Sequence, residues 1–310
     1  MVRSWYNSLL RFSFRAWYWL HGNVHRYFLD HIRVRGAVKL KIENLQLRMY
    51  SRGDDGIVDA LYFTEERYGE YEEVNLFREL AQNSHIIFDI GANTGLYSIV
   101  SKLSNPKARV VAFEPYGPNI ERLNRNAELN DLVKGIEVVQ LAVGDENNKT
   151  DFAIPGDGGI SDVLSADIEF TEQFSEKEDD FKTVQVPQMT LDAFVAKMEF
   201  PGVDLMKIDV ENYELSVFKG ALEVLRKFRP VILVELFVDR ERIEFFKNHL
   251  QPIGYHCYLV GKKGLFRTDD LVENPDCRNY LFSTQRSEIP YLSYSDLPQL
   301  AAAIAPKQQN

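Results

Sequence analysis

Apolar and polar positions along the chain follow two periods, and each period predicts one type of element. Short apolar runs such as 86–90 and 109–113 have the length of buried strands, and the segments after them show the helical period of about 3.6 residues. Strands are predicted at 86–90, 109–113, 136–141, 149–154, 183–187, 204–209, 230–236, 255–260 and 278–283, and helices at 95–104, 117–130, 190–198, 212–227 and 239–250. Strands that alternate with helices through compact turns favour a parallel, doubly wound α/β sheet.

The patterning divides the chain into a main domain and three smaller parts. They are a basic aromatic helical arm at 1–40, a β/helix lead-in at 41–84, the main domain at 85–285 and a C-terminal tail at 286–310. Alternation at 37–50 predicts a strand or hairpin, and 70–82 predicts a helix. Inside the main domain, residues 155–182 are irregular and acidic. An excursion of this length is either a lid-like recognition element or a solvated loop.

The composition is that of an ordinary soluble globular protein, with 45% hydrophobic and 26% charged residues among 310. A net charge of −10 excludes a nucleic-acid binder that works by bulk electrostatics. Two cysteines without a metal-type spacing indicate a reducing compartment. No apolar run reaches the roughly 18 residues of a membrane span, and the N-terminus lacks the features of a signal peptide, so we expect a cytoplasmic protein.

The charge is spread unevenly, and the N-terminal arm is basic. Residues 1–40 hold seven Lys and Arg against one acid, a net charge of +6, which leaves −16 for the remainder. The apolar residues on one helical face of the arm are Trp5, Leu9, Phe12, Ala16, Trp19 and Leu20. Arg11, Arg15 and Arg26 lie on a neighbouring side. Two interpretations stay open: a peripheral membrane contact through residues 1–35 on anionic lipid, or a helix packed on its own domain or on a second subunit.

The first strand of the main domain ends in a glycine turn, within the stretch FDIGANTG. A strand, glycine turn and helix in this order hold a nucleotide-like ligand at the carboxyl end of the strand. The turn has side chains where a dinucleotide motif needs glycine, and it lacks the Gly-Lys-Ser/Thr ending of a P-loop. Its residues are Gly91, Ala92, Asn93, Thr94 and Gly95. Asp89 at its mouth would repel a pyrophosphate and attract a cation, so the turn favours S-adenosylmethionine, which carries a sulfonium and an ammonium group.

Two later strand ends add candidates to this donor site. Glu114 ends the second strand, where a carboxylate can accept hydrogen bonds from both ribose hydroxyls, and Pro115 then stops the strand. Ala142 and Val143 at the end of the third strand could form the floor under an adenine. Asp145 could reach the adenine amino group, although GDE is also an ordinary turn sequence.

The fourth and fifth strands carry charged residues in otherwise apolar stretches. Lys207 and Asp209 share one strand face, Glu211 follows as the strand ends, and Glu235 ends the fifth strand. Charged groups inside a parallel sheet are costly unless they are paired or used. Either Lys207 forms an ion pair with Asp209 or Glu211 that serves only the fold, or three carboxylates converge beside the ligand.

Six stretches, in this order, carry a resemblance to a known family: FDIGANTGLYS, VVAFEPYGPNIERLNRNAELN, LAVGDE, VPQMTLDAF, LMKIDVENYELSVFKGA and PVILVEL. Across about residues 84–237, the chain resembles the FkbM family of S-adenosylmethionine-dependent methyltransferases. The resemblance implies the seven-stranded, mostly parallel Rossmann-like sheet of class I methyltransferases, and methyl transfer to a hydroxyl oxygen. By analogy, Asp89 and Gly91 through Gly95 would line the methionine part of the donor, Glu114 the ribose, and Asp209 the face where acceptor meets methyl group.

One position departs from the family pattern. The family usually has glycine after the DVE acids, where this chain has Asn212. A glycine there suggests a positive φ angle, which asparagine tolerates best among ordinary residues. The exchange leaves the expected fold unchanged but adds a side chain near the acceptor site.

The expected reaction is in-line attack of an acceptor hydroxyl on the sulfonium methyl group, with much of the rate coming from positioning. A sugar hydroxyl has to lose its proton, so Asp209 is the first candidate for a general base and Glu211 the second, with Lys207 tuning their charge. In a metal-assisted alternative, Mg²⁺ would bind to Asp209, Glu211 and Glu235.

The acceptor is expected to be a small molecule or glycan, with a lipid-linked sugar or polysaccharide precursor favoured by analogy. A different class of function is a non-catalytic adaptor with the same fold, recruited by its basic arm. The intact acids and glycine turn weigh against the adaptor. A dinucleotide-linked oxidoreductase is disfavoured by Asp89 and by the lack of a nicotinamide-side domain.

Overall fold

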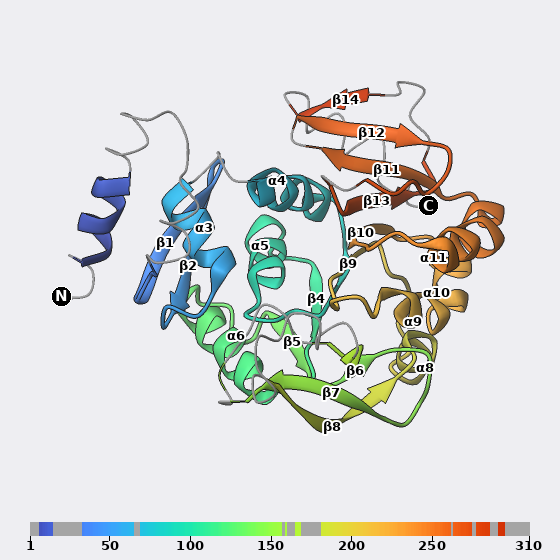
Figure 1. Ribbon diagram of the computed structural model, residues 1–310, viewed down its shortest axis with the longest axis horizontal. Coiled ribbons are helices and arrows are strands. Elements are labelled where there is room, and N and C mark those ends of the chain that lie inside the picture. Colours follow the sequence, from blue (N-terminus) through green and yellow to red (C-terminus); the bar gives the residue numbers. More distant parts are fainter. Residues whose placement is uncertain are drawn as a thin grey trace.

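The computed structural model describes residues 6–14, 33–64, 69–156, 159, 165–168, 181–261, 263–274, 277–285 and 291–294. Within these residues, nine strands form the main sheet in the order β14-β12-β11-β13-β10-β9-β3-β4-β5 (Figure 1). The strands are β3 Ile86–Ile90, β4 Arg109–Phe113, β5 Ile136–Val139, β9 Leu205–Ile208, β10 Val231–Glu235, β11 His256–Gly261, β12 Gly264–Thr268, β13 Asn279–Ser283 and β14 Tyr291–Ser293. The five strands from β5 to β10 are parallel, and β13 begins an antiparallel extension.

The doubly wound α/β sheet predicted from the sequence is confirmed, and its extent is larger than expected. Seven of the predicted strands join it, but β12 and β14 add a further antiparallel edge to the expected seven. Residues 291–293 therefore belong to the sheet, although the sequence placed them in a loose tail. Residues 286–290 and 295–310 of that tail, and most of the insertion at 155–182, lie outside the described residues.

Two predicted strands belong to a separate ribbon rather than to the main sheet. β7 (Lys149–Pro155) pairs antiparallel with β8 (Phe181–Met189), and β6 (Ala142–Val143) pairs with β8. The predicted strand 136–141 ends at Val139 as β5, and β6 begins only at Ala142. The outer half of β8 is largely exposed, whereas strands of a parallel sheet need to be buried on both faces. This pattern explains why the ribbon stays outside the main sheet.

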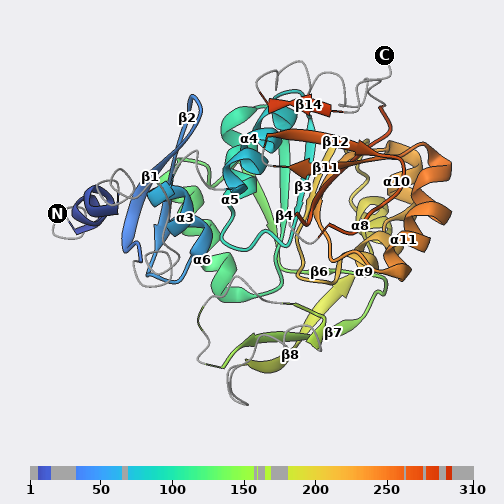
Figure 2. The ribbon, with the colours of Figure 1, turned by 45° about the horizontal axis from the view of Figure 1, so that its top comes forward.

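Helices cover both faces of the main sheet (Figures 1 and 2). One face carries α4 (Gly69–Gln82), α5 (Leu96–Ser104) and α6 (Gly117–Leu129), and the other carries α8 (Leu191–Lys197), α9 (Glu214–Lys219), α10 (Leu222–Phe228) and α11 (Arg240–Phe245). Successive residues of a strand pack into two different hydrophobic cores: Ile87 lies in the core on the first face and Phe88 in the core on the second. Burial on both faces is the reason why these strands are continuous apolar runs.

Two predicted helices are interrupted. The helix expected at 212–227 begins at Glu214 and is broken into α9 and α10, because Gly220 lies against another backbone: a Cβ atom there would be 1.9 Å from the carbonyl oxygen of Gly144. The helix expected at 239–250 is α-helical only to Phe245 and continues as a π-helix, η2 (Phe246–Leu250), and a 3₁₀ turn, η3 (Gln251–Ile253).

The lead-in is a third layer outside α5 and α6. Its hairpin, β1 (Gly36–Ile42) and β2 (Leu45–Ser51), is the one predicted at 37–50, and α3 (Gly56–Thr64) follows it as an unpredicted helix. The hairpin is joined to α6 because the backbone N–H of Tyr50 donates to Asn126 Oδ1 at 2.8 Å. The lead-in is therefore part of the main fold rather than an appendage.

Residues 6–14 of the N-terminal arm form a helix that packs through an unpredicted side. Phe14 is buried against Phe63 with ring centroids 5.8 Å apart, and Asn7 donates to the carbonyl of Arg35 at 2.9 Å. Leu9 and Phe12, from the predicted apolar face, are 48% and 71% exposed. Trp5, Ala16, Trp19 and Leu20 lie outside the described residues. No helix in the described part of the chain is long and apolar enough to cross a bilayer.

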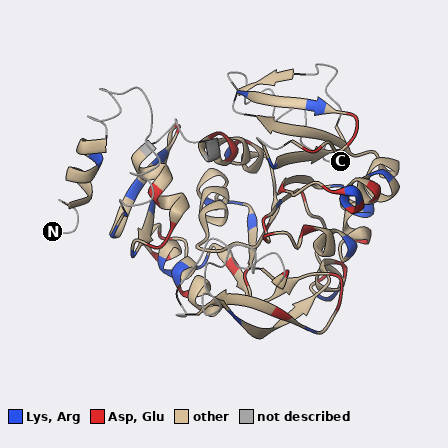
Figure 3. Cartoon of the chain, in the orientation of Figure 1, with Lys and Arg blue, Asp and Glu red and all other residues tan. Residues whose placement is uncertain are grey.

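Charged residues of both signs are interspersed over the outer helices (Figure 3). On α10, Arg226 pairs with Glu223 at 2.7 Å, and on α11 Arg240 pairs with Glu244 at 2.8 Å. Exposed pairs at this helical spacing contribute a few tenths of a kcal/mol. The outer surface of these helices is thus an ordinary solvated face.

Candidate active site

A cavity of about 700 Å³ lies at the carboxyl ends of β3, β4, β9 and β10. It brings together most of the residues that the sequence singled out: Asp89, Gly91, Ala92, Asn93, Thr94, Glu114, Pro115, Ala142, Val143, Lys207, Asp209, Glu211 and Glu235. Gly95 and Asp145 do not line it, and Asp145 is exposed. A ligand site outside the carboxyl ends of the strands is the position expected for an open α/β sheet.

The glycine turn is tight because three strands meet at it. The N–H groups of Gly91 and Ala92 both donate to the carbonyl of Phe113, at 3.0 and 2.9 Å. Gly91 has a φ angle of 80°, and a Cβ atom on it would lie 1.8 Å from the carbonyl oxygen of Asp209. Only glycine fits this position, where the turn touches the end of β9.

Asp89 is a buried carboxylate beside the turn. It is 2% exposed and accepts a hydrogen bond from the Ser98 hydroxyl at 2.6 Å. Burial raises the pKa of Asp89 to about 6, while the hydrogen bond from Ser98 and the charge of Lys207 act in the opposite direction. A cation entering the cavity would favour its charged form.

Glu114 connects the end of β4 to the turn. Its two carboxylate oxygens accept the backbone N–H groups of Asn93 and Tyr116, both at 2.9 Å. Burial raises the pKa of Glu114 to about 7, because these hydrogen bonds only partly offset the lost hydration. The side chain is therefore fixed in orientation before any ligand binds.

The lead-in also reaches the glycine turn, through a residue that the sequence patterning missed. Asp55 accepts a hydrogen bond from the Thr94 hydroxyl at 2.8 Å. Its other oxygen accepts the N–H of Val58 at 2.9 Å and so caps the start of α3. An aspartate directly before the apolar run GIVDALYF is a signal of a helix start, so Asp55 and α3 could both have been found.

Next to Asp89, the cavity is lined by acids around one buried lysine, Lys207, which pairs in register with Asp89 on the adjacent strand β9. Lys207 is 1% exposed, and its Nζ lies 3.2 Å from Glu73 Oε1 and 3.2 Å from Asp209 Oδ2. The Tyr97 hydroxyl donates to Glu73 at 2.9 Å. The carboxylates raise the pKa of Lys207 above its ordinary value against the effect of burial. The Lys207–Asp209 ion pair is thus present and also faces the cavity.

Glu235 and Asn279 extend this acid-lined side. They lie opposite each other on β10 and β13, and both line the cavity. Burial raises the pKa of Glu235 to about 7, and the negative charge of Asp209 contributes a smaller part of the increase. The Oδ1 atom of Asn279 is buried without a hydrogen-bond partner among the described residues. A ligand hydroxyl is the kind of donor that would satisfy it.

Glu73 is the main residue of this side that the sequence analysis did not select. It belongs to the predicted helix 70–82 and precedes Leu76 and Phe77 by three and four residues, so it shares their buried face. An acid on the apolar face of a helix is costly unless it is used, and this pattern could have identified it.

The metal-assisted alternative lacks a ligand set in the described part of the chain. No three His, Cys, Asp or Glu side chains there are grouped as a metal ion would need. Asp209 is held by the Nζ of Lys207, which already supplies a positive charge at this point. Asp209, Glu211 and Glu235 therefore do not form the predicted Mg²⁺ site among these residues.

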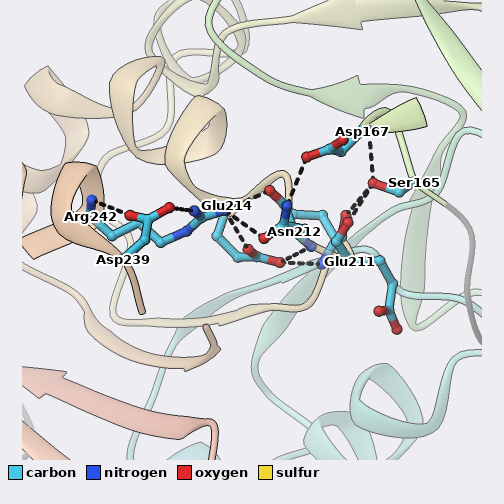
Figure 4. Close-up of polar contacts among 8 residues, drawn as sticks. Ser165, Asp167, Glu211, Asn212, Glu214, Asp239 and Arg242 are labelled. Carbon is cyan, nitrogen blue, oxygen red and sulfur yellow. Dashed lines mark hydrogen bonds and ion pairs between the residues drawn. The ribbon is translucent and has the colours of Figure 1, made fainter. Parts of the chain in front are cut away.

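Asn212 has the predicted backbone conformation but a different side-chain position. Its φ angle is 72°, and that of Glu211 is 51°. The sequence placed this side chain near the acceptor site. It does not line the cavity, however, and lies between Asp167 and Arg242 (Figure 4). The two polar partners draw the amide away from the acceptor side, whereas the neighbouring Glu211 lines the cavity.

Comparisons with known proteins show to which family the chain belongs. The family model of the methyltransferase FkbM domain matches residues 89–260. The chain is 28% identical over 226 residues to the antimetabolite synthetase AmbE of Pseudomonas aeruginosa, a match that covers 63% of this chain and 10% of that protein. It is 27% identical over 177 residues to the hexuronic acid methyltransferase AglP of Haloferax volcanii, covering 57% of this chain and 66% of AglP.

A solved structure, the methyltransferase FkbM from Methylobacillus flagellatus, has 18% identity and a TM-score of 0.41, with 74% of this chain and 55% of that chain covered. A likeness at this level adds no argument about activity. The family model of the methyltransferase FkbM domain spans more than half of the chain. The chain belongs to the FkbM methyltransferase family.

Proposed function

We propose that the chain transfers the methyl group of S-adenosylmethionine to a hydroxyl oxygen of a sugar or of a glycan or lipid-linked precursor. The observation that carries the proposal is the composition of one cavity. A donor side built from the glycine turn, Asp89 and Glu114 adjoins an acid-lined side built from Glu73, Glu235 and Lys207. Asp209 belongs to both sides, because its backbone touches the glycine turn and its side chain pairs with Lys207.

The donor side fits a cationic adenosyl ligand. Asp89 offers negative charge near the turn, and Glu114 offers fixed carboxylate oxygens for ribose hydroxyls. Ala142 and Val143 provide an apolar surface for the adenine. The bound donor supplies a methyl group on a positively charged sulfur, which is reactive toward an oxygen nucleophile. The residues of the chain have to orient the acceptor and take up its proton.

Asp209 is the proposed general base. Its side chain is 28% exposed into the cavity, and Lys207 holds one carboxylate oxygen, which leaves the other for an acceptor hydroxyl. Glu235 is a second candidate, since burial raises its pKa to about 7, near the pH at which a general base works well. Glu211, the second candidate from the sequence, also lines the cavity and now ranks third.

The acid-lined side favours a neutral acceptor rich in hydroxyl groups. Carboxylates and the unpartnered Asn279 Oδ1 accept hydrogen bonds from hydroxyls, as in sugar sites. An anionic acceptor would be repelled there, because three carboxylates surround a single ammonium group. The relative AglP is named for a hexuronic acid, so a comparison of neutral glycosides with the corresponding uronates tests the acceptor class.

The central experiment combines calorimetric titration with S-adenosylmethionine and a labelled-methyl transfer assay on a panel of neutral glycosides, uronates and lipid-linked sugars. We expect donor binding and transfer to a neutral hydroxyl acceptor, with Asp209→Asn as the inactive control. Donor binding without transfer to any member of the panel would contradict the acceptor class. Absence of donor binding would favour the adaptor alternative.

We also propose that the arm contacts the cytoplasmic face of a membrane. The exposure of Leu9 and Phe12 on the helix at 6–14, next to the basic residues of the arm, supports this contact. Co-sedimentation with vesicles of anionic lipid should weaken strongly in Phe12→Glu. Val133→Glu changes another exposed apolar side chain far along the sequence and is the control. Equal pelleting of both variants would refute the contact.

A further inference from the structure

The turn after β9 is strained at the edge of the cavity. Glu211 and Asn212 have φ angles of 51° and 72°, so two successive residues are left-handed. Each such residue costs roughly 1–2 kcal/mol outside glycine, and such strain persists only where surrounding contacts determine it. Glu211 lines the cavity at this point. The contacts that hold the turn therefore also fix the position of a side chain in the proposed acceptor site.

Three segments hold the backbone of this turn (Figure 4). Glu214 on α9 accepts the N–H groups of Asn212 at 3.0 Å and Val210 at 3.4 Å. Arg242 on α11 donates to the carbonyl of Asn212 at 2.8 Å. The hydroxyl of Ser165 donates to the carbonyl of Glu211. The turn is thus fastened to α9, to α11 and to the segment at 165–168.

The Asn212 carboxamide joins two of these segments directly. Its Nδ2 donates to Asp167 Oδ2 at 2.8 Å, and its Oδ1 accepts from Arg242 Nη2 at 2.8 Å. Arg242 is fixed in turn by an ion pair with Asp239 at 2.6 Å. In Figure 4 the amide of Asn212 lies between Asp167 and Arg242, and the carboxylate of Glu211 points away from both. An asparagine is needed here because one partner requires a donor and the other an acceptor.

The segment at 165–168 is a wall of the cavity. Ala166 lines the cavity, as does Phe152 on β7. The carbonyl of Ser165 accepts the N–H of Ala153 at 2.8 Å, which joins this segment to β7. Asn212 therefore connects a wall of the cavity to a helix on the far side of the turn.

We infer that Asn212 is a positioning residue for the acceptor: through the strained turn it sets the place of the Glu211 carboxylate, and it leaves the contacts that hold Asp89 and Glu114 on the donor side unaffected. The donor side is held by separate contacts, from Ser98 to Asp89 and from Glu114 to the glycine turn. The inference deepens the proposed function and rests on it. Its consequence is selective: disruption of the link weakens acceptor binding, not donor binding.

The test reverses the direction of one hydrogen bond. Asn212→Asp removes the donor and sets two carboxylates against each other at the Asp167 contact, while Arg242 still has its acceptor. The exchange is isosteric, and both residue types tolerate a positive φ angle, so the fold is maintained. In the double variant Asn212→Asp/Asp167→Asn, the new amide at position 167 donates a hydrogen bond to the carboxylate at position 212, and the link is restored. Asn124→Asp makes the same chemical change on an exposed face of α6.

Three readouts are measured on the full chain. We expect the acceptor KM of Asn212→Asp to rise about tenfold, the cost of losing a partly buried hydrogen bond, with kcat changed by less than about twofold. The calorimetric Kd for S-adenosylmethionine should stay within about twofold of the parent, since its contacts are separate. Amide hydrogen exchange of peptides covering 165–168 should accelerate. The double variant should recover both the KM and the exchange rate, and Asn124→Asp should resemble the parent.

Failure of the double variant to recover, or an equal loss of donor affinity in Asn212→Asp, would overturn the positioning role. If the parent chain methylates no member of the acceptor panel, the proposed function fails. In that case the exchange pattern and the donor Kd still decide whether Asn212 links the wall to α11.

Discussion

The two sides of the cavity are built in different ways. Most of the donor side comes from one contiguous motif: the glycine turn, Asp89 just before it and Ser98 just after it all lie within ten residues, and Glu114 follows at the end of the next strand. The acceptor side is assembled from distant segments, with Glu73 on α4, Glu235 on β10 and Asn279 on β13. The donor side is therefore fixed by local geometry, whereas the acceptor side depends on how the outer elements pack and can differ while the fold stays the same.

The largest expected effect separates chemistry from donor binding. Asp209→Asn should lower kcat by about 100-fold or more, because the amide cannot take up the acceptor proton, and should leave the Kd for S-adenosylmethionine within a few-fold. Single-turnover methyl transfer and calorimetry measure the two quantities. Glu235→Gln is the matched variant at the second candidate base. A larger loss of kcat in Glu235→Gln than in Asp209→Asn would transfer the role of base to Glu235.

The next largest effect concerns the stability of the acceptor side. Lys207→Met leaves Glu73, Asp209 and Glu235 without their common buried cation, and should lower the free energy of unfolding by about 3 to 5 kcal/mol. Denaturant unfolding gives this value. Lys219→Met removes an exposed pair with Glu241 and should cost less than about 1 kcal/mol. Equal losses in the two variants would show that the buried cluster contributes no more than a surface pair.

A smaller effect is expected on the donor side. Glu114→Gln puts an amide donor where both oxygens now accept N–H groups, and should weaken binding of S-adenosylmethionine by about 10- to 100-fold. Calorimetry at one pH measures it. Glu137→Gln, at an exposed Arg109 pair on the neighbouring strand, is the control and should bind the donor normally. An unchanged Kd in Glu114→Gln would remove this residue from the ribose site.

The last expected effect is a pH dependence that has opposite signs for the stability of the fold and for donor binding. Asp89 and Glu114 have pKa values of about 6 and about 7 in the folded chain, above the ordinary values of 3.8 and 4.5. At pH values between the ordinary pKa values and those in the folded chain, the folded state binds more protons than the unfolded state. The ligand-free chain should therefore lose stability as the pH rises from about 5 to about 8.

Donor binding should strengthen over the same range, because the charged carboxylates attract the sulfonium. Thermal unfolding with and without S-adenosylmethionine shows both trends: a falling Tm for the ligand-free chain and a rising shift on donor addition. Asp89→Asn should flatten both. A donor-induced shift that falls with rising pH would contradict the assignment of these acids.

The contiguous part of the site could be predicted from the sequence because its geometry is local. A glycine turn after a buried strand fixes where Asp89 and Glu114 meet, and the strand periods placed Lys207 and Asp209 on one face. The positive φ angle at Asn212 followed from the family resemblance, because the family has glycine at this position. Long apolar strands were also predictable, since burial on both faces leaves a continuous apolar run.

The remaining parts depend on contacts that no local pattern contains. β7 and β8 leave the main sheet because their exposed outer faces suit a ribbon, and the sequence distance between them hides their pairing. Asn279 reaches the cavity only because β13 inserts beside β10. The side chain of Asn212 turns away from the acceptor because Asp167 and Arg242 hold it, and both are distant in sequence.

The strand order also limits how the protein can be shortened. β13 lies between β10 and β11, although it follows both in the sequence and falls after the residues 89–260 that match the family model. A fragment trimmed to that match would keep β10 and β11 and lose the strand that joins them, together with Asp55 and Glu73. Its two bare strand edges would invite pairing between molecules, so such a fragment is suited to studying aggregation, not catalysis.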